Sequence, residues 1–228
     1  MSRRHAPESA VDAVDLDAPV LAPDFYRRPT LRVARDLLGK ILVHRTRGRL
    51  TAGRIVEVEA YRGPEDRAAH TAGGRRTARN EVMWGVGGHL YVYFTYGMHH
   101  CCNVVTRAAG QPEAVLLRAL EPLAGLATMR RRRGSARDLP PMALARGPGN
   151  LCRAMGIDRR HDGANLVTGT IVIVDAPRVR TGLVAVSPRI GVAYAGDHAL
   201  RPWRFFVRDS PAVSASGKRR SASTVSRA

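Results

Sequence analysis

The spacing of apolar residues along the chain predicts three short helices. Between Thr30 and Leu38 the apolar positions recur at helical spacing, and Gly39 follows them as a typical C-terminal cap. The segment 125–133 also has a helical pattern and ends in a run of four arginines. A third helix is predicted over 147–157, after a Gly-Pro turn.

Strands take up more of the predicted core than helices do. Their hydrophobic patterns place them at 40–44, 50–60, 89–96, 114–120, 170–174, 189–194 and 203–207. The chain lacks the regular strand–helix–strand rhythm of a doubly wound parallel sheet. The pattern therefore predicts one mixed domain of the α+β class.

The strand predicted over 50–60 carries the most distinctive polar residues. Alternation puts Ile55, Glu57 and Glu59 on one face, with the apolar residues between and after them on the other. Two carboxylates therefore point the same way. Glu59 lies beside the aromatic Tyr61, which fits a general base next to a stacking surface, although a glutamate at a strand end is more often the partner of an arginine.

Aromatic residues are concentrated in the segment 87–103, although only 5% of the chain is aromatic. They are Tyr91, Tyr93, Phe94 and Tyr96. Such a cluster suits stacking on nucleic-acid bases, but it also suits the core of a strand, and we expect a core position for Phe94 and at least one tyrosine. Tyr96 precedes Gly97 in a predicted turn, where its ring would be exposed unless it inserts into a partner.

The residues with metal-binding side chains do not have the spacing of a metal site. Two histidines and two cysteines are adjacent at 99–102, and adjacent residues rarely converge on one ion. His70 could be a ligand, an acid or simply a histidine at the end of a helix. The glycine pairs at 73–74 and 87–88 are not followed by the lysine of a phosphate loop. We therefore expect neither a metal nor a cofactor.

Charge narrows the class of partner. The 228 residues carry a formal net charge of +18, which favours a polyanion and above all nucleic acid. All but two of the 37 basic residues are arginine, the exceptions being Lys40 and Lys218. Codon bias in a G+C-rich genome would also produce this skew. Amine nucleophiles are scarce in either case, which limits Schiff-base chemistry.

The composition of the two ends of the chain predicts a tail on each side of a single domain. Residues 1–22 and 217–228 have little periodicity, so we expect disordered tails there and a domain over 23–216. Three cysteines cannot form a disulfide framework, and neither an export signal nor a membrane-spanning run is visible. We expect a soluble, cytoplasmic protein without membrane contact.

Five motifs, in this order, resemble those of the alkyladenine (3-methyladenine) DNA glycosylase family. They are EVEAYRGPEDRAAH (57–70), LYVYFTYGMHHCCN (90–103), VLLRALEP (115–122), GPGNLCRAMGI (147–157) and RIGVAYAGDHALRPWRFFVRDSP (189–211). The similarity runs from about Phe25 to Ser214. Several long motifs in sequence are far more specific than any single segment.

The resemblance implies a fold and an activity. The fold would be a curved, largely antiparallel sheet flanked by short helices, like the C-terminal domain of a formyltransferase. The activity would be base-excision repair by a monofunctional glycosylase that acts as a monomer on duplex DNA. It would flip alkylated or deaminated purines out of the helix, hydrolyse the glycosidic bond and leave an abasic site. 3-Methyladenine and 7-methylguanine are the expected lesions. The sequence leaves open whether hypoxanthine or ethenoadenine is also excised.

The resemblance also assigns roles by position. Glu59 matches the general base, Arg118 a catalytic-site arginine that also meets phosphate, and Ile190 a main-chain carbonyl that holds the water. The walls of the base pocket match Tyr61, His70, Tyr93 and Asn103, the last of which excludes normal guanine. Tyr96 and Met98 match the residues that wedge into the duplex.

The chain departs from the family pattern in small ways. His99 and His100 stand where more aromatic or apolar residues are expected, and two extra residues separate Asn103 from Arg118. Two other classes of function remain. A non-catalytic arginine-rich nucleic-acid-binding module would explain the charge and the aromatics but not Glu59. A transferase on the same scaffold would need a cofactor motif that the sequence lacks.

Overall fold

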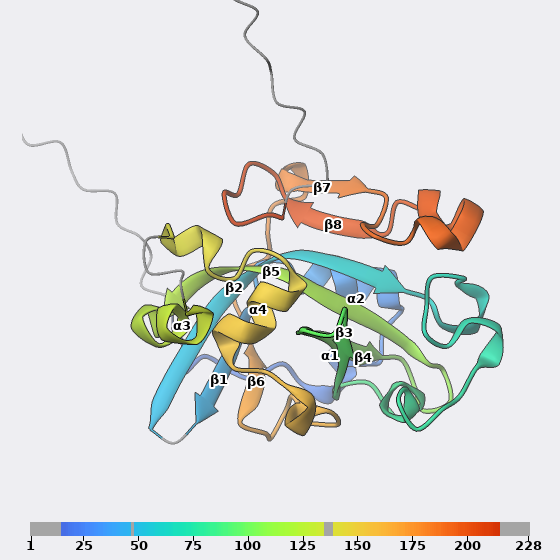
Figure 1. Ribbon diagram of the computed structural model, residues 1–228, viewed down its shortest axis with the longest axis horizontal. Coiled ribbons are helices and arrows are strands. Elements are labelled where there is room, and N and C mark those ends of the chain that lie inside the picture. Colours follow the sequence, from blue (N-terminus) through green and yellow to red (C-terminus); the bar gives the residue numbers. More distant parts are fainter. Residues whose placement is uncertain (1–14, 47, 135–138, 215–228) are drawn as a thin grey trace, which may run out of the picture.

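Strands dominate the architecture, as the hydrophobic pattern indicates. The computed structural model of the protein describes residues 15–46, 48–134 and 139–214 (Figure 1). The strands of this part are β1 (Ile41–Thr46), β2 (Arg49–Tyr61), β3 (Leu90–Thr95), β4 (His99–Thr106), β5 (Glu113–Ala124), β6 (Ile171–Val174), β7 (Val184–Ser187) and β8 (Arg204–Val207).

These strands form one curled sheet. Its main path runs β3-β4-β5-β2-β1-β6, while β8 pairs with β2 and β7 pairs with β8. Every pairing between these strands is antiparallel, which allows short connections between neighbours. The expected fold class, a single α+β domain with an antiparallel sheet, is confirmed.

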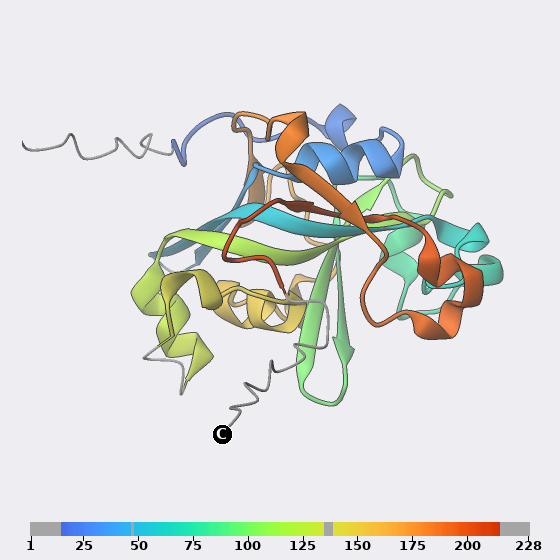
Figure 2. The ribbon, with the colours of Figure 1, turned by 90° about the horizontal axis from the view of Figure 1, so that it is seen from above.

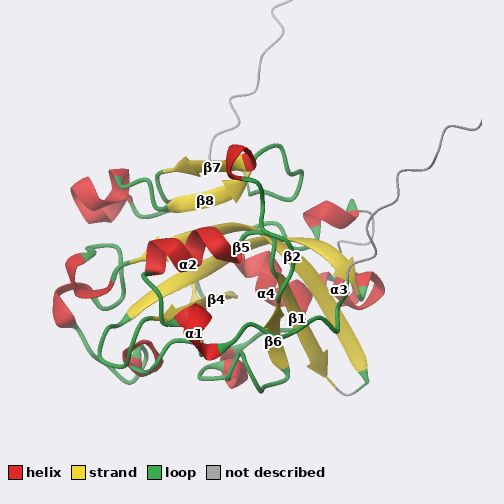
Figure 3. Cartoon of the chain, turned by 180° about the vertical axis from the view of Figure 1, so that it is seen from behind, coloured by secondary structure: helices red, strands yellow, loops and turns green. Residues whose placement is uncertain are grey.

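Four short α-helices cover the two faces of the sheet in the described residues. They are α1 (Pro23–Tyr26), α2 (Thr30–Leu37), α3 (Leu126–Arg133) and α4 (Pro148–Met155). Helices α1 and α2 lie on one face (Figure 3), whereas α3, α4 and the β3–β4 hairpin lie on the other (Figure 2). The three helices predicted from the sequence are thereby confirmed.

Helix α2 shows how the apolar pattern produces the core. Its residues Val33, Ala34 and Leu37 are fully buried. The chain then turns into β1 at Gly39, whose φ is +88° and whose N–H donates to the carbonyl of Ile55 at 2.8 Å. A Cβ at Gly39 would lie 2.9 Å from a backbone oxygen of the loop after β6, so both the conformation and the close approach favour glycine.

The alternation predicted for β2 is correct for its two carboxylates and wrong for Ile55. A β-bulge places Ile55 opposite Leu120 and Glu57 opposite Ala119, so one extra residue is inserted between them. Ile55 therefore joins Val58 in the main core, while Glu57 and Glu59 share the other face. The bulge, which alternation cannot reveal, reverses the side chains that precede it.

The strand predicted over 189–194 is wrong. This stretch is a loop that enters a 3₁₀ helix at Ala193–Leu200. The N–H of Ile190 donates to a side-chain carboxylate instead of a neighbouring strand, and Gly191 has a φ of +77°. Strands β4 and β7 are additional elements that the pattern did not predict.

Residues at the start of the described chain pack along the sheet. Val20 forms a bridge with Val174, and the N–H of Leu21 donates to the carbonyl of Ile173 at 2.9 Å. The rest of the expected N-terminal tail, and all of the expected tail at 217–228, lie outside the described residues. No helix within the described ranges is long and apolar enough to cross a membrane.

Candidate active site

Glu59 lies in the centre of the sheet, where β2 pairs with β5 on one side and β8 on the other. Its side chain is 0% exposed. Its Oε1 accepts a hydrogen bond from the backbone N–H of Ile190 at 2.7 Å, and its Oε2 accepts one from the Tyr61 hydroxyl at 3.0 Å. Nη1 of Arg118 lies 3.2 Å from Oε1. The carboxylate is therefore held by three donors from three parts of the chain.

Arg118 joins Glu59 to the second buried carboxylate of β2. Its Nε donates to Glu57 at 2.9 Å and its Nη2 to the Ser214 hydroxyl at 3.3 Å. Glu57 also accepts from Nε of Arg204 at 2.7 Å and from the N–H of Ser214 at 2.6 Å. Two arginines thus balance two glutamates inside the protein. Arg118 lies beside the expected general base, but all its side-chain nitrogens face protein oxygens, so its arrangement gives no support to a phosphate contact.

Burial is the largest influence on the acidity of Glu59. It raises the pKa of this carboxyl above its usual range because the charged form loses its water. The Arg118 guanidinium, the Ile190 N–H and the Tyr61 hydroxyl oppose the shift but do not cancel it. A carboxyl with a raised pKa can accept a proton near neutral pH, which suits a general base.

A cavity of about 50 Å³ is lined in part by Tyr61, whose hydroxyl donates to this carboxylate. Its walls bring together the four residues expected to form a base pocket, which are Tyr61, His70, Tyr93 and Asn103. The remaining lining comes from Ala68, Met83, Tyr91, Ala114 and Tyr194. Glu59 itself does not line the cavity and reaches it only through the Tyr61 hydroxyl.

In the cavity, the His70 ring packs edge to face against two tyrosine rings. The rings of His70 and Tyr93 have centroids 4.6 Å apart at an angle of 76°. Tyr91, which is 1% exposed, lies within hydrogen-bond distance of Nδ1 of His70, at 2.8 Å. Its backbone carbonyl accepts from the amide of Asn103 at 3.2 Å. These two contacts of Tyr91 fix the orientation of the His70 and Asn103 side chains.

His70 is neutral at physiological pH. Burial, followed by the charges of Arg79 and Arg75, lowers its pKa to about 4. The ring therefore meets any bound group as a hydrogen-bonding imidazole without charge.

The expected wedge residues lie at the tip of the hairpin formed by β3 and β4. This hairpin extends away from the body of the protein (Figure 2). Tyr96 is 81% exposed and Met98 71% exposed. Tyr96 has a φ of +51° and Gly97 one of +65°, as in the tight turns that favour Asn-Gly. The exposed turn expected at Tyr96 is confirmed, whereas Phe94, expected in the core, is 46% exposed.

Sequence reasoning missed a buried ion pair that positions the site. Arg189 donates through Nη2 to Asp66 at 2.8 Å, and its guanidinium stacks between the rings of Tyr61 and Trp203. The pair connects the loop after β2 to the loop that carries Ile190. Despite its own burial, the pKa of Asp66 is held below its usual range by Arg189 and by two backbone N–H groups. Both residues lie inside the quoted motifs, but their separation along the chain hides the contact.

The structure assigns Ile190 a contact through its N–H, whereas the expected contact was through its carbonyl. No group of three metal-binding side chains occurs in the parts of the chain described above. The cysteines of β4 are buried and free, and burial raises the pKa of Cys101 to about 11, so this thiol is protonated at neutral pH.

The chain is similar to known proteins over most of its length. Residues 24–211 match the family model described as methylpurine-DNA glycosylase. A protein of Methanocella arvoryzae is 51% identical over 197 residues, covering 86% of this chain and 96% of its own. Relatives from Bacillus cereus strain G9842 and Desulfitobacterium hafniense are each 46% identical over 199 residues, covering 84% and 85% of this chain and 97% and 98% of theirs. Each relative bears the name "Putative 3-methyladenine DNA glycosylase".

Proposed function

The chain belongs to the methylpurine-DNA glycosylase family and is a DNA glycosylase of DNA repair, and from this premise we propose that Glu59 activates the water that releases the base. Membership of an enzyme family excludes a binding module without catalysis. The observation that carries the proposal is the buried carboxylate of Glu59, held by three donors behind an aromatic cavity.

Glu59 has two tasks in this reaction. Cleavage passes through a cationic sugar, so the carboxylate stabilises positive charge as well as orienting water. The water oxygen forms a bond to C1′, its proton passes to Glu59, and the bond from C1′ to the purine nitrogen breaks, its electron pair leaving with the base. Of the three donors, Tyr61 is the one on the cavity wall, so its hydroxyl is the group that water displaces.

The cavity suits a cationic purine. One face of the Tyr61 ring already lies against the guanidinium of Arg189, and one face of the Tyr93 ring against that of Arg79. The opposite faces would attract the positive charge of a 3-methyladenine or 7-methylguanine nucleotide. His70, being neutral, does not repel it. Asn103 fixes the wall that excludes the exocyclic amino group of normal guanine.

Entry of the base requires the cavity to widen. A space of about 50 Å³ holds only a few water molecules. Tyr194 is the lining side chain most free to move, because it is 72% exposed and donates one hydrogen bond, to the carbonyl of Ala68 at 3.2 Å.

The hairpin tip provides the wedge. A base within a duplex is out of reach, and extruding it costs a few kcal/mol. Tyr96 and Met98, both exposed, would fill the gap in the stack and offset that cost. The protein acts on duplex DNA as a monomer.

The product is an abasic site without strand scission. Scission through a Schiff base needs an amine in the site, from a lysine or from the N-terminus, and the N-terminus lies outside the described residues. Lys40 is buried and donates to Asp175 at 2.6 Å, away from the cavity. The other lysine, Lys218, lies outside the described residues.

The test is incubation of the protein with duplex oligonucleotides that contain one 3-methyladenine, 7-methylguanine or hypoxanthine, followed by alkali to reveal abasic sites. We expect release of both cationic bases. The reaction with the hypoxanthine duplex measures how far the protein accelerates release of a neutral base. Borohydride should trap no covalent complex. Intact methylated DNA would overturn the activity, and a trapped complex would overturn the water nucleophile.

A further inference from the structure

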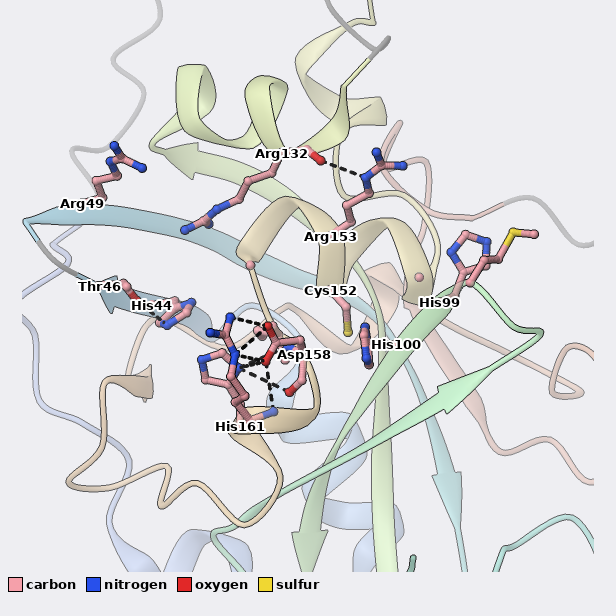
Figure 4. Close-up of a pocket in the computed structure, with 15 residues that line it drawn as sticks. His44, Thr46, Arg49, His99, His100, Arg132, Cys152, Arg153, Asp158 and His161 are labelled. Atoms are coloured by element: carbon pink, nitrogen blue, oxygen red, sulfur yellow. Dashed lines mark hydrogen bonds and ion pairs between the residues drawn. The ribbon is translucent and has the colours of Figure 1, made fainter.

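A second and larger cavity, of about 850 Å³, lies next to the β3–β4 hairpin (Figure 4). We call it the Arg/His pocket. It is lined by residues of β1, the start of β2, the tip of the hairpin, α3, α4 and the turn after α4. It shares no lining residue with the base cavity.

The Arg/His pocket reaches the face of the hairpin opposite the base cavity. Tyr91 and Tyr93, which line the base cavity, alternate along β3 with Val92 and Phe94. Residues paired across the two strands share a face, and Phe94 pairs with His100. His100 lines the Arg/His pocket and its ring lies 5.1 Å from that of Phe94. At the tip the pocket also includes His99, which pairs with Thr95 on the other face, so it extends around the end of the hairpin.

The lining of the pocket carries a large excess of positive charge. Four arginines line it, namely Arg49, Arg132, Arg153 and Arg160, together with His44, His99, His100 and His161. Among the described residues, the one carboxylate in the lining is that of Asp158, and it is paired with Arg160 at 2.7 Å. An anion is the ligand that this balance favours.

Two glycines let His99 and Arg132 lie against α4. A Cβ at Gly149 would lie 2.9 Å from Cγ of the His99 ring, and one at Gly156 would lie 2.6 Å from Cζ of Arg132. Nη1 of Arg132 donates to the carbonyl of Met155 at 2.7 Å, which anchors the side chain at the C-terminal end of α4. The wall is thus fixed in position.

Several donors of this wall make no hydrogen bond or ion pair with the residues that the structure describes. Arg153 donates through Nε to the carbonyl of Arg132 at 2.8 Å, which leaves its terminal nitrogens for a ligand (Figure 4). Arg49 is exposed at the rim. His44, in contrast, is buried and occupied, with Nδ1 at 2.8 Å from the Met155 carbonyl and Nε2 at 2.6 Å from the Thr46 hydroxyl.

We propose that the Arg/His pocket binds the phosphate backbone of the undamaged strand. The inference rests on the proposed function, in which the hairpin tip enters the duplex. The two strands then run on the two sides of the hairpin, and the damaged strand must pass over the base cavity. The undamaged strand passes over the other side, where the pocket opens beside the exposed Met98. Guanidinium groups bind phosphate bidentately, so the arginines of the pocket wall suit a phosphate ligand.

The test determines which single phosphates, and on which strand, contribute to affinity through the pocket. Duplexes carry one neutral methylphosphonate linkage, placed in turn at each position of the undamaged or the damaged strand. Their affinity is measured by fluorescence anisotropy for the wild type and for the double variant Arg49→Gln/Arg153→Gln. The matched control is Arg32→Gln/Arg35→Gln, which removes two exposed arginines from α2 on the opposite face of the sheet.

We expect one or two undamaged-strand linkages to weaken wild-type binding about tenfold and to have no effect on the pocket variant. The slope of log affinity against log salt should fall by about one for each phosphate that the pocket variant no longer neutralises. The control variant should keep the tenfold effect, and unfolding curves should show that both variants fold.

Other outcomes overturn the proposal. Coupling confined to the damaged strand, or equal effects in wild type and pocket variant, would refute it. So would calorimetric binding of inorganic phosphate that the variant loses while its DNA affinity is unchanged, since this would assign the pocket to a free anion. Failure of the proposed function is recognised separately, because the wild type would then release no base from methylated DNA.

Discussion

At the scale of single residues, two glutamates on one face of β2 have different surroundings. Glu57 accepts from Arg118, Arg204 and both donors of Ser214, so four donors from three residues hold it, three of them on Oε1. Glu59 accepts from one backbone N–H and one phenol, with one guanidinium nitrogen nearby. Glu57 therefore holds the arginines in place, and Glu59 is the carboxylate that can exchange a donor for water.

The raised pKa of Glu59 predicts the pH dependence of base release. A general base must be deprotonated, so the rate should fall with decreasing pH through a pKa above the ordinary glutamate value of about 4.3. Single-turnover release from 7-methylguanine duplexes between about pH 4 and 8 measures this acid limb.

The matched control for the pH profile is His70→Gln. His70 titrates at about pH 4 and stays neutral above it, so this variant should lower the rate but keep the same acid limb. A wild-type rate that is constant down to the ordinary glutamate pKa would contradict the assignment of Glu59.

At the scale of elements, the β3–β4 hairpin combines an exposed aromatic residue with an unfavourable backbone. Tyr96 has a φ of +51°, a conformation that costs a residue other than Gly, Asn or Asp about 1 kcal/mol or more. The ring is 81% exposed, so its packing against the described residues offsets little of this cost. The cost is accounted for if the ring is needed in the DNA.

Tyr96→Asn should therefore separate stability from activity. Asparagine suits this turn position, so the free energy of unfolding should rise by about 1 kcal/mol in urea titrations. Base release from duplex DNA should fall at the same time, because the wedge is lost. The control Tyr96→Phe keeps both the ring and the backbone, and should match the wild type in both measurements. Equal activity of Tyr96→Asn and wild type would refute the wedge.

Elements were predictable from the sequence where local pattern determines them. Helix α2 and strand β5 follow directly from their apolar spacing. Strand β4 was missed because it begins with two histidines, and 189–194 was wrongly predicted because side-chain pairing replaces strand pairing there. The bulge in β2 depends on its register with β5, which no pattern within β2 records.

At the scale of the whole molecule, the net charge of +18 is not spread evenly among free side chains. In the arginine run of α3, Arg132 contacts the end of α4 and Arg133 donates to Asn150. Other arginines fill buried pairs, as Arg118 and Arg189 do. The net charge therefore predicts the class of partner, a polyanion. It does not predict which arginines are free to contact that partner.

Exposed arginines should make DNA affinity depend steeply on salt. Each phosphate neutralised releases counterions, and about six or more contacts would cost a factor of 10³ or more between about 50 and 200 mM salt. Anisotropy titrations of an undamaged duplex measure the slope. A nearly constant affinity over this range would contradict a surface that follows the DNA backbone.

The motifs predict which residues belong to the site but not how they are connected. They single out Glu59, four residues that line one cavity and two residues at the hairpin tip, and the roles of these residues stay predictions. The contact between Asp66 and Arg189, and the donation from the Ile190 N–H to Glu59, join segments far apart in the chain. Only the assembled sheet brings them together.

The measurement that tests the account most directly compares Glu59→Gln with the wild type on one methylated duplex. The amide keeps the shape of the side chain but cannot accept the proton. We predict that single-turnover base release is abolished while affinity for the damaged duplex is unchanged or tighter. Release at the wild-type rate by Glu59→Gln would show that this carboxylate does not activate the water.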